Sequence, residues 1–233
     1  MTSKRPVVLF YILTISTVLF LVHIGSRTTT VLAQNTPPNR EHCIIIDPGH
    51  GGEDGGATSC SGKLESSYNL EIASRLNDLF HLLGYSTRMI RTEDVSIYTS
   101  GSTLSQKKLS DLKERVRICN ETPGSILVSI HQNMYPDSKY HGAQVLYASS
   151  EGSKQLASQL QFLLTETINP GSRRQIKQGT GLYIMEHVSR PGILVECGFL
   201  SNPQEDALLK TTEYQQQICC VIVSAVSVYL SNT

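Results

Sequence analysis

Two histidines and two glutamates in this chain have the types and positions from which a metal site can be built. His50 lies in a glycine-rich loop that directly follows three isoleucines, and His131 and Glu196 each close a further apolar run. Imidazole nitrogens and carboxylate oxygens are metal ligands, and a carboxylate at the end of a buried strand is costly unless it is used or paired. Glu65 precedes an amphipathic segment, so it falls at or near a helix N-terminus, from which a carboxylate could point at a metal.

The loop that carries His50 spans residues 47–56 and contains Pro48 and five glycines. This composition predicts a turn whose backbone approaches a ligand closely. Metal-bound histidines usually donate their other N–H to a carboxylate or a carbonyl. Asp47 is therefore predicted either to orient such a histidine or to cap the turn.

The positions of these side chains require strands that end at a common edge. Apolar runs predict strands at 43–47, 85–90, 126–131, 143–148 and 193–196. Amphipathic stretches predict helices at about 68–83, 105–120, 152–168 and 203–230. This alternation implies an α/β fold, a single domain with a mostly parallel twisted sheet covered by helices on both faces. Sheets of this kind build their sites at the carboxyl ends of their strands.

Local signals mark two helix ends. Gly84 is expected to end the first helix. Asn202, Pro203 and Glu205 are expected to start the last one, as cap, first residue and third residue.

Composition limits the functions open to the chain. With 233 residues and 39% hydrophobic content, it can bury one substantial core. The formal net charge is zero, Trp is absent and no basic stripe occurs, which argues against nucleic-acid binding. The six cysteines include no Cys-x-x-Cys pair, so most are predicted to be small buried apolar residues. One disulfide that includes Cys60 or Cys119 remains open.

Four motifs occur in a characteristic order. They are Asp-Pro-Gly-His-Gly-Gly at 47–52, Lys-Leu-Glu at 63–65, Ser-Ile-His-Gln-Asn at 129–133 and Leu-Val-Glu-Cys-Gly-Phe-Leu-Ser-Asn at 194–202. From about Cys43 to its C-terminus, the chain resembles the zinc-dependent N-acetylmuramoyl-L-alanine amidases (amidase type 3), which cut the amide between N-acetylmuramic acid and L-alanine in peptidoglycan. Through residues 106–115 and the Ser-Ile-His-Gln-Asn motif at 129–133, it is similar most of all to the sporulation and germination amidases of spore-forming bacteria.

The resemblance implies that His50, Glu65 and His131 bind one Zn2+ and that Glu196 is the catalytic acid/base. Three protein ligands leave a fourth position for water, which is the pattern of a catalytic zinc site. Zinc lowers the pKa of bound water to roughly 7, and Glu196 would take the proton and return it to the leaving nitrogen. The loop glycines would let the sugar-peptide substrate approach the metal. Peptidoglycan is then the expected partner, in spore cortex or cell-wall remodelling, with an activator protein as a possible second partner.

Residues 1–33 are interpreted as a targeting segment. Lys4 and Arg5 precede an apolar run of 19 residues, and Val31-Leu32-Ala33 offers a cleavage site. Because about 20 apolar residues span a bilayer, the segment is either a cleaved signal peptide or an uncleaved anchor. Both predict an exported protein, in the cell wall or the forespore intermembrane space, that meets the membrane only through this segment. The linker and the zinc amidase domain are then expected at 34–41 and 42–233.

Several neighbouring residues are given lesser roles. Gln132 and Glu186 depart from the family pattern, where a small and a basic residue are common, and neither is expected to touch the metal ligands. Arg115 is expected to be solvated or salt-bridged rather than a substrate clamp. Ser129 and Asn133 are expected to serve the backbone turn.

The remaining histidines are expected to be structural or solvated: His42, His81, His141 and His187. Of these, His141 is the nearest competitor as a ligand. It precedes a strand, however, and in a parallel sheet this is the wrong edge for the site.

Two other classes of function share part of this pattern. A zinc peptidoglycan hydrolase of another kind, such as a stem-peptide carboxypeptidase, would use the same chemistry, so only the family motifs favour the amidase. A non-catalytic wall-binding protein with this fold would be expected to have lost Glu196 or a ligand, and all four residues are present.

Overall fold

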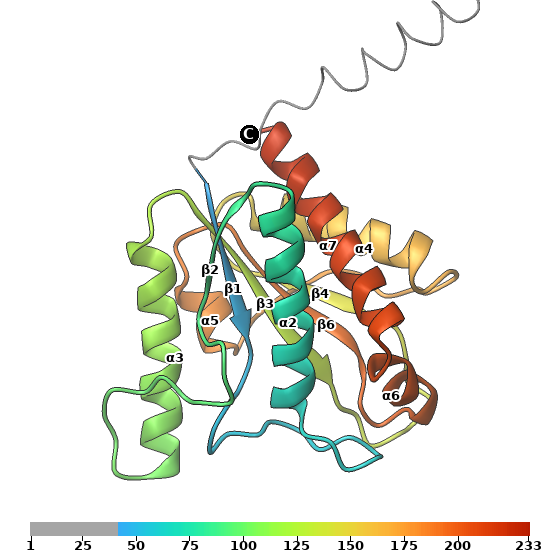
Figure 1. Cartoon of the computed structure of the whole chain (residues 1–233), viewed down its shortest axis with the longest axis horizontal. Helices are drawn as coiled ribbons and strands as arrows, with labels where there is room; N and C mark the ends of the chain where they lie inside the picture. Colours follow the sequence, from blue (N-terminus) through green and yellow to red (C-terminus); the bar gives the residue numbers. More distant parts are fainter. Residues whose placement is uncertain (1–41) are drawn as a thin grey trace, which may run out of the picture. The chain divides into compact units, whose positions relative to one another are not determined.

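The structure, a computed structural model, describes residues 42–233 (Figure 1). Its strands are β1 (Cys43–Pro48), β2 (Ser86–Met89), β3 (Ser125–Asn133), β4 (Gln144–Tyr147), β5 (Lys177–Gln178) and β6 (Gly192–Phe199). Its helices are α2 (Glu65–Leu82), α3 (Leu104–Glu121), α4 (Ser153–Thr167), α5 (Tyr183–His187), α6 (Pro203–Leu209) and α7 (Thr212–Ser231). The predicted alternation of strands and helices is confirmed.

The six strands form one sheet in the order β2-β1-β3-β6-β4-β5. β2, β1, β3 and β6 run parallel to one another, whereas β4 is antiparallel to β6. The predicted mostly parallel sheet is therefore confirmed, but the direction assumed for the fourth strand is wrong. The start of β4 lies at the carboxyl edge of β6, where Gln144 is the Cα partner of Glu196. His141 precedes β4, so the same antiparallel direction places it toward the carboxyl edge of the sheet, and the expectation that it lies at the opposite edge is wrong.

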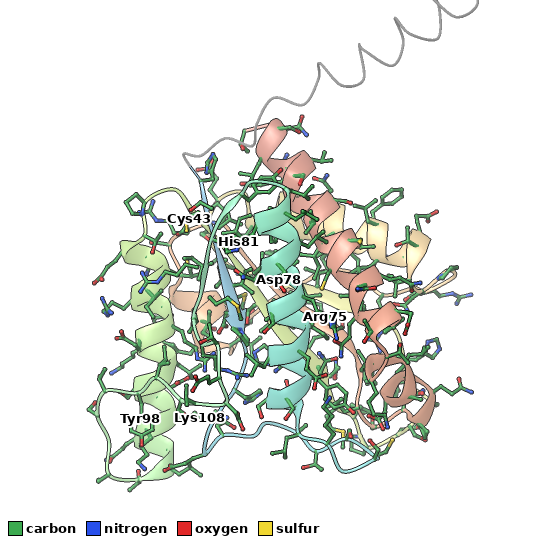
Figure 2. The ribbon with its side chains drawn as sticks, viewed as in Figure 1. Cys43, Arg75, Asp78, His81, Tyr98 and Lys108 are labelled. Atoms are coloured by element: carbon green, nitrogen blue, oxygen red, sulfur yellow. The ribbon has the colours of Figure 1, made fainter. Side chains whose placement is uncertain are left out.

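Helices cover both faces of the sheet, as predicted. Successive strand residues point to opposite faces, and the isoleucines of β1 follow this rule. Ile44 and Ile46 are buried in a cluster with α2, α4 and α7. Ile45 is buried on the other face with α3 and α5. In the layer of α2 and α7, Arg75 of α2, labelled in Figure 2, donates to Gln215 of α7 at 2.8 Å.

The helix ends follow their local signals, with one exception. Gly84 adopts a left-handed φ of 82° just past α2, and the Asn202 side chain accepts the first N–H groups of α6. The single last helix predicted for 203–230 is wrong. α6 ends at Leu209 and α7 begins at Thr212, because the Thr211 side chain accepts the Tyr214 N–H and caps a new helix. β5 and α5 were not predicted, since segments of two and five residues leave no readable period.

All six cysteines are free, so the disulfide left open by the sequence is absent. Cys119, Cys197 and Cys219 are buried, as expected of small apolar residues, while Cys60 and Cys220 are exposed.

None of the helices formed by residues 42–233 is both long and apolar enough to span a membrane. The targeting segment predicted at 1–33 and the linker at 34–41 lie outside the described residues.

Candidate metal centre

The three side chains predicted to bind metal come together at the carboxyl edge of the sheet. His50 follows β1, His131 lies near the end of β3, and Glu65 is the first residue of α2. Their donor atoms lie within 4.8 Å of one another. Nε2 of His50 is 3.3 Å from Oε2 of Glu65, and Nδ1 of His131 is 2.9 Å from Oε1. Two imidazoles and one carboxylate form a donor set that zinc accepts, so this group could hold a metal ion.

The charge state of Glu65 suits a cation site. Burial alone would raise the pKa of this carboxyl, but the adjoining His131 and His50 rings hold it well below its ordinary value. For His50 the effect of burial is the reverse, since it lowers the pKa of an imidazole. The neighbouring carboxylates of Glu65 and Asp54 have the larger effect, so the pKa of His50 is raised overall. The centre thus presents an ionised carboxylate between two imidazoles.

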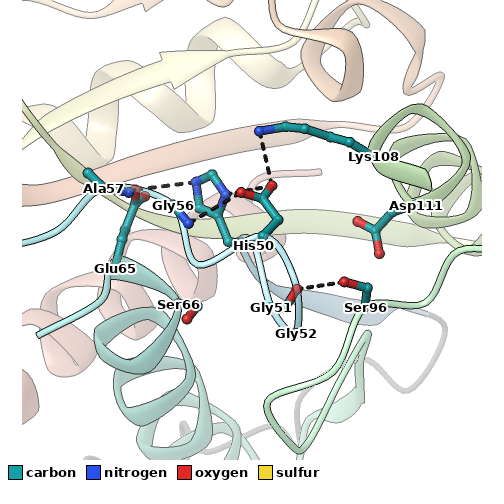
Figure 3. A network of polar contacts seen from close by, with 12 residues as sticks. His50, Gly51, Gly52, Gly56, Ala57, Glu65, Ser66, Ser96, Lys108 and Asp111 are labelled. Carbon is teal, nitrogen blue, oxygen red and sulfur yellow. Dashed lines mark hydrogen bonds and ion pairs between the residues drawn. The ribbon is translucent and has the colours of Figure 1, made fainter. Parts of the chain in front are cut away.

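Asp54 fixes the orientation of His50. Its Oδ2 lies 3.0 Å from Nδ1 of His50, which leaves Nε2 facing Glu65. Lys108 of α3 reaches the same carboxylate at 3.0 Å, as seen beside His50 in Figure 3. An oriented imidazole of this kind is typical of metal sites. This role of Asp54 was not predicted, although its position four residues after His50 in the same loop was a signal for it.

The glycines of the loop make room for the protein's own side chains. A Cβ at Gly49 would lie 2.1 Å from Nε2 of His131. A Cβ at Gly56 would lie 2.6 Å from Oε2 of Glu65 and 2.7 Å from Cδ2 of His50. Two of these glycines therefore let the three candidate metal ligands approach one another. Access of the substrate through the glycine-rich loop stays a prediction.

Two buried arginines hold the backbone of the same loop. Arg91 donates to the carbonyls of Pro48 and Gly49 at 2.9 and 3.0 Å. Arg115 donates to those of Pro48 and His50 at 2.9 and 2.8 Å. His50 is the one non-glycine residue with a positive φ, 61°, among residues 42–233. These bonds hold an unfavourable backbone conformation at the position that carries the imidazole.

Asp47 supports the arginine rather than a metal-bound histidine. It is fully buried and accepts from Arg115 at 2.5 Å and from the Ser129 hydroxyl at 2.6 Å. Both alternatives predicted for Asp47, orienting a histidine and capping the turn, are thereby replaced. Ser129 does not serve the turn, and Arg115 is salt-bridged and only 2% exposed rather than solvated.

Glu196 lies beside the centre on the next strand. Its Cα partner in β3 is His131. Its Oε2 is buried without a hydrogen-bond partner among the described residues. Burial raises the pKa of Glu196 to about 7, against the opposing effect of His131. A buried, unpaired carboxyl with a pKa near neutrality is suited to carrying protons.

The two departures from the family pattern have different surroundings. The Gln132 side chain donates to Asn69 at 3.3 Å, and its backbone N–H donates to Glu65 at 3.2 Å. Asn69 in turn donates to the Gly49 carbonyl. The expectation that Gln132 stays apart from the ligands is wrong. Glu186 accepts the Gly181 N–H at 2.7 Å, a local contact within its own turn.

The other histidines make contacts of a structural kind. Ring nitrogens of His42, His81 and His187 lie within 3.2 Å of Gly124, Thr87 and Tyr183, respectively. Within residues 42–233, the candidate metal group contains His50 and His131 and no other histidine. Asn133 is the last residue of β3, and its carbonyl accepts the Leu200 N–H at 2.8 Å. The turn role expected of Asn133 stays a prediction.

Fold and site together define an α/β domain with a candidate hydrolytic metal centre at its sheet edge. Residues 44–228 match the N-acetylmuramoyl-L-alanine amidase family. The germination-specific N-acetylmuramoyl-L-alanine amidase of Bacillus subtilis (strain 168) is 36% identical over 192 residues, which cover 81% of this chain and 80% of the relative.

Solved structures agree with this match. The CwlD amidase from Clostridioides difficile, solved in complex with the GerS lipoprotein, has a TM-score of 0.78 and 34% identity, over 82% of this chain and 99% of that one. An N-acetylmuramoyl-L-alanine amidase from Clostridium difficile 630 has a TM-score of 0.72 and 30% identity, over 84% and 100%. The chain belongs to the N-acetylmuramoyl-L-alanine amidase family, and it is an amide hydrolase that acts on peptidoglycan.

Proposed function

We propose that this amidase is zinc-dependent, with His50, Glu65 and His131 as the ligands of one Zn2+ and Glu196 as the acid/base. The observation that carries the proposal is the position of Glu196. Glu196 of β6 is the Cα partner of His131 in β3, and its Oε2 is buried without a hydrogen-bond partner among the described residues. A buried carboxyl without a partner is costly to maintain, and proton transfer at the adjoining centre gives it a use.

In this proposal each side chain has one task. Bound zinc would polarise the scissile carbonyl, lower the pKa of the attacking water to roughly 7 and, as a cation, lower that of Glu196. Glu196 takes the proton of the attacking water and returns it to the leaving nitrogen, so it acts first as base and then as acid. Asp54 keeps Nε2 of His50 directed at Glu65 throughout.

The relatives support a biological setting. We propose that the chain remodels spore cortex or cell wall, because a germination-specific amidase is among its relatives. The proposed place of action is extracytoplasmic, with residues 1–33 as the exporting segment. A protein partner is also proposed, since the C. difficile amidase was solved in complex with a lipoprotein.

The test is digestion of purified peptidoglycan by the full-length chain with zinc, with the products identified by mass spectrometry. We expect stem peptides with a free N-terminal L-alanine. Shortened stems still joined to muramic acid would indicate a carboxypeptidase, and wall binding without any product would indicate a binding protein.

The role of Glu196 is tested by Glu196→Gln, which keeps the shape of the side chain. We expect a loss of about 10²- to 10⁴-fold in kcat/KM, the usual contribution of a general acid/base, with one zinc still bound. Glu166→Gln, an exposed position on α4, is the matched control. Near-normal turnover of Glu196→Gln would rule out the proposed role.

A further inference from the structure

Arg174 is held rigidly beside the candidate active site. Its guanidinium carbon lies 4.4 Å from the centre of the Phe199 ring. Nε donates to the His141 carbonyl at 2.8 Å, and Nη1 donates to Oε1 of Gln144 at 3.1 Å. Three contacts from three segments therefore fix the plane of this side chain, although it is only half-buried.

One of these contacts is with β6, the strand that carries Glu196, and another is with β4, the strand beside it. Gln144 is the Cα partner of Glu196, because β4 runs antiparallel to β6. Phe199 is the last residue of β6, three positions after Glu196. Adjacent strands lie about 4.8 Å apart, so the guanidinium, which contacts the Gln144 side chain, is separated from the proposed acid/base by that one side chain.

The positive charge of Arg174 is left unpaired. None of the ion pairs within residues 42–233 includes it, and in the same part of the chain Nη2 has no hydrogen-bond partner. An open pocket of about 460 Å³ borders the side chain, and Lys139, His141 and Arg173 also line it. Arginine presents five N–H donors in a planar fork that matches a carboxylate, and at least two of the five remain free here.

We propose that Arg174 binds the free carboxylate of the stem residue that follows L-alanine in the substrate; this rests on the zinc-amidase mechanism proposed above. Hydrolysis takes place at the nitrogen of L-alanine, and an extended chain spans at most about 3.6 Å per residue. The carboxylate of the second residue thus lies within about 7 Å of the reacting nitrogen. This reach agrees with a guanidinium one side chain away from Glu196. Arg174 is then a specificity-determining residue for acidic stems.

The proposal is tested with two peptidoglycan fragments of identical glycan and stem. One carries a free α-carboxylate on the second stem residue, and the other carries the carboxamide. We expect the zinc-loaded, full-length wild type to have a higher kcat/KM on the acid. Arg174→Gln should lose about 10- to 100-fold on the acid and less than about 3-fold on the amide, because only the acid forms the charge-assisted pair. Arg174→Lys keeps the charge but not the planar fork, so its kcat/KM on the acid should lie between those of the wild type and of Arg174→Gln.

Arg117→Gln is the matched control. Arg117 lies on α3 and pairs with Glu114 and Glu121, away from β4 and β6. Its substitution should leave both rates and their ratio unchanged. An equal loss on both fragments in Arg174→Gln would overturn the proposal, because it would show that Arg174 only braces Gln144. No loss on either fragment would overturn it as well.

A binding measurement separates this proposal from the amidase proposal. Calorimetry compares the free acid and amide stem peptides on the wild type and on Arg174→Gln, and it requires no turnover. The acid peptide should bind more tightly to the wild type, and this preference should disappear in Arg174→Gln. If the wild type does not distinguish the peptides, the inference about Arg174 is wrong even where peptidoglycan is cleaved. A wild type that distinguishes them without cleaving would contradict only the amidase proposal.

Discussion

Gly49→Ala should remove metal binding while leaving the fold intact. The substitution adds one methyl group at a position where the backbone is not in the left-handed region, so alanine brings no φ strain of its own. The new Cβ would meet the His131 ring at 2.1 Å from Nε2, 2.3 Å from Cε1 and 2.6 Å from Cδ2.

The size of the effect follows from these distances. Because a Cβ contact shorter than 3.0 Å is essentially never found, the ring must move from 2.1 Å by about 0.9 Å. Metal-ligand distances tolerate only about ±0.2 Å, so the displaced imidazole no longer completes the site. Changes in groups that merely support a ligand cost about 10- to 100-fold in metal affinity. Displacement of a ligand itself should therefore cost at least about 100-fold.

The assay is zinc affinity by competition with a chelator, together with urea unfolding of the zinc-free protein. Overpacking of this kind should lower the free energy of unfolding by only about 1–3 kcal/mol. Gly55→Ala is the control in the same loop, since its Cβ would meet only the Leu64 side chain, at 3.1 Å, and Leu64 is 41% exposed. If Gly49→Ala bound zinc as tightly as Gly55→Ala does, the assignment of His131 as a ligand would be refuted.

Two further predictions concern the supports of the loop and of Glu65. Burial would raise the pKa of Asp47, but Arg115 and Ser129 hold it below 3.8, so the ionised carboxylate stabilises the fold above about pH 4 and this stabilisation is lost as the pH falls. Asp47→Asn should cost about 1.5–3 kcal/mol at neutral pH by removing one of the two ion pairs of Arg115, since Asp111 keeps the other. It should also flatten the fall in unfolding free energy from about pH 4 to pH 2 in urea titrations, and an unchanged pH slope would contradict this role of Asp47. Gln132→Ala should lower zinc affinity about 10-fold by freeing Asn69 next to Glu65; unchanged affinity in chelator competition would show that Asn69 needs no such support.

The candidate site was largely predictable because most of its residues lie near the carboxyl ends of strands. His50 follows an apolar run, His131 and Glu196 each close one, and parallel strands bring their carboxyl ends to one edge. Glu65 was placed by helix geometry, which the first residue of α2 confirms. These inferences need only the local sequence pattern and the rule that parallel strands end at one edge of a sheet.

Features that depend on contacts between distant segments were not predictable in this way. The direction of β4 was misjudged, although only ten residues separate it from β3, too few for a helical crossover to a parallel strand. The use of Gly49 as space for His131 joins residues 82 positions apart. The carbonyl contacts of Arg91 similarly depend on where the chain after β2 returns to β1. Residue types alone do not predict such contacts between segments that are distant in the sequence.

The arginine-held loop also bears on how the enzyme acquires its metal. Three consecutive carbonyls, of residues 48–50, are bound by guanidinium groups that belong to the protein itself. In a zinc finger the ion supplies the folding energy, so the apo-protein unfolds. Here the scaffold is already assembled by internal bonds, so uptake of the proposed zinc ion would be a simple binding equilibrium. The local supply of zinc would then switch the enzyme on or off without refolding.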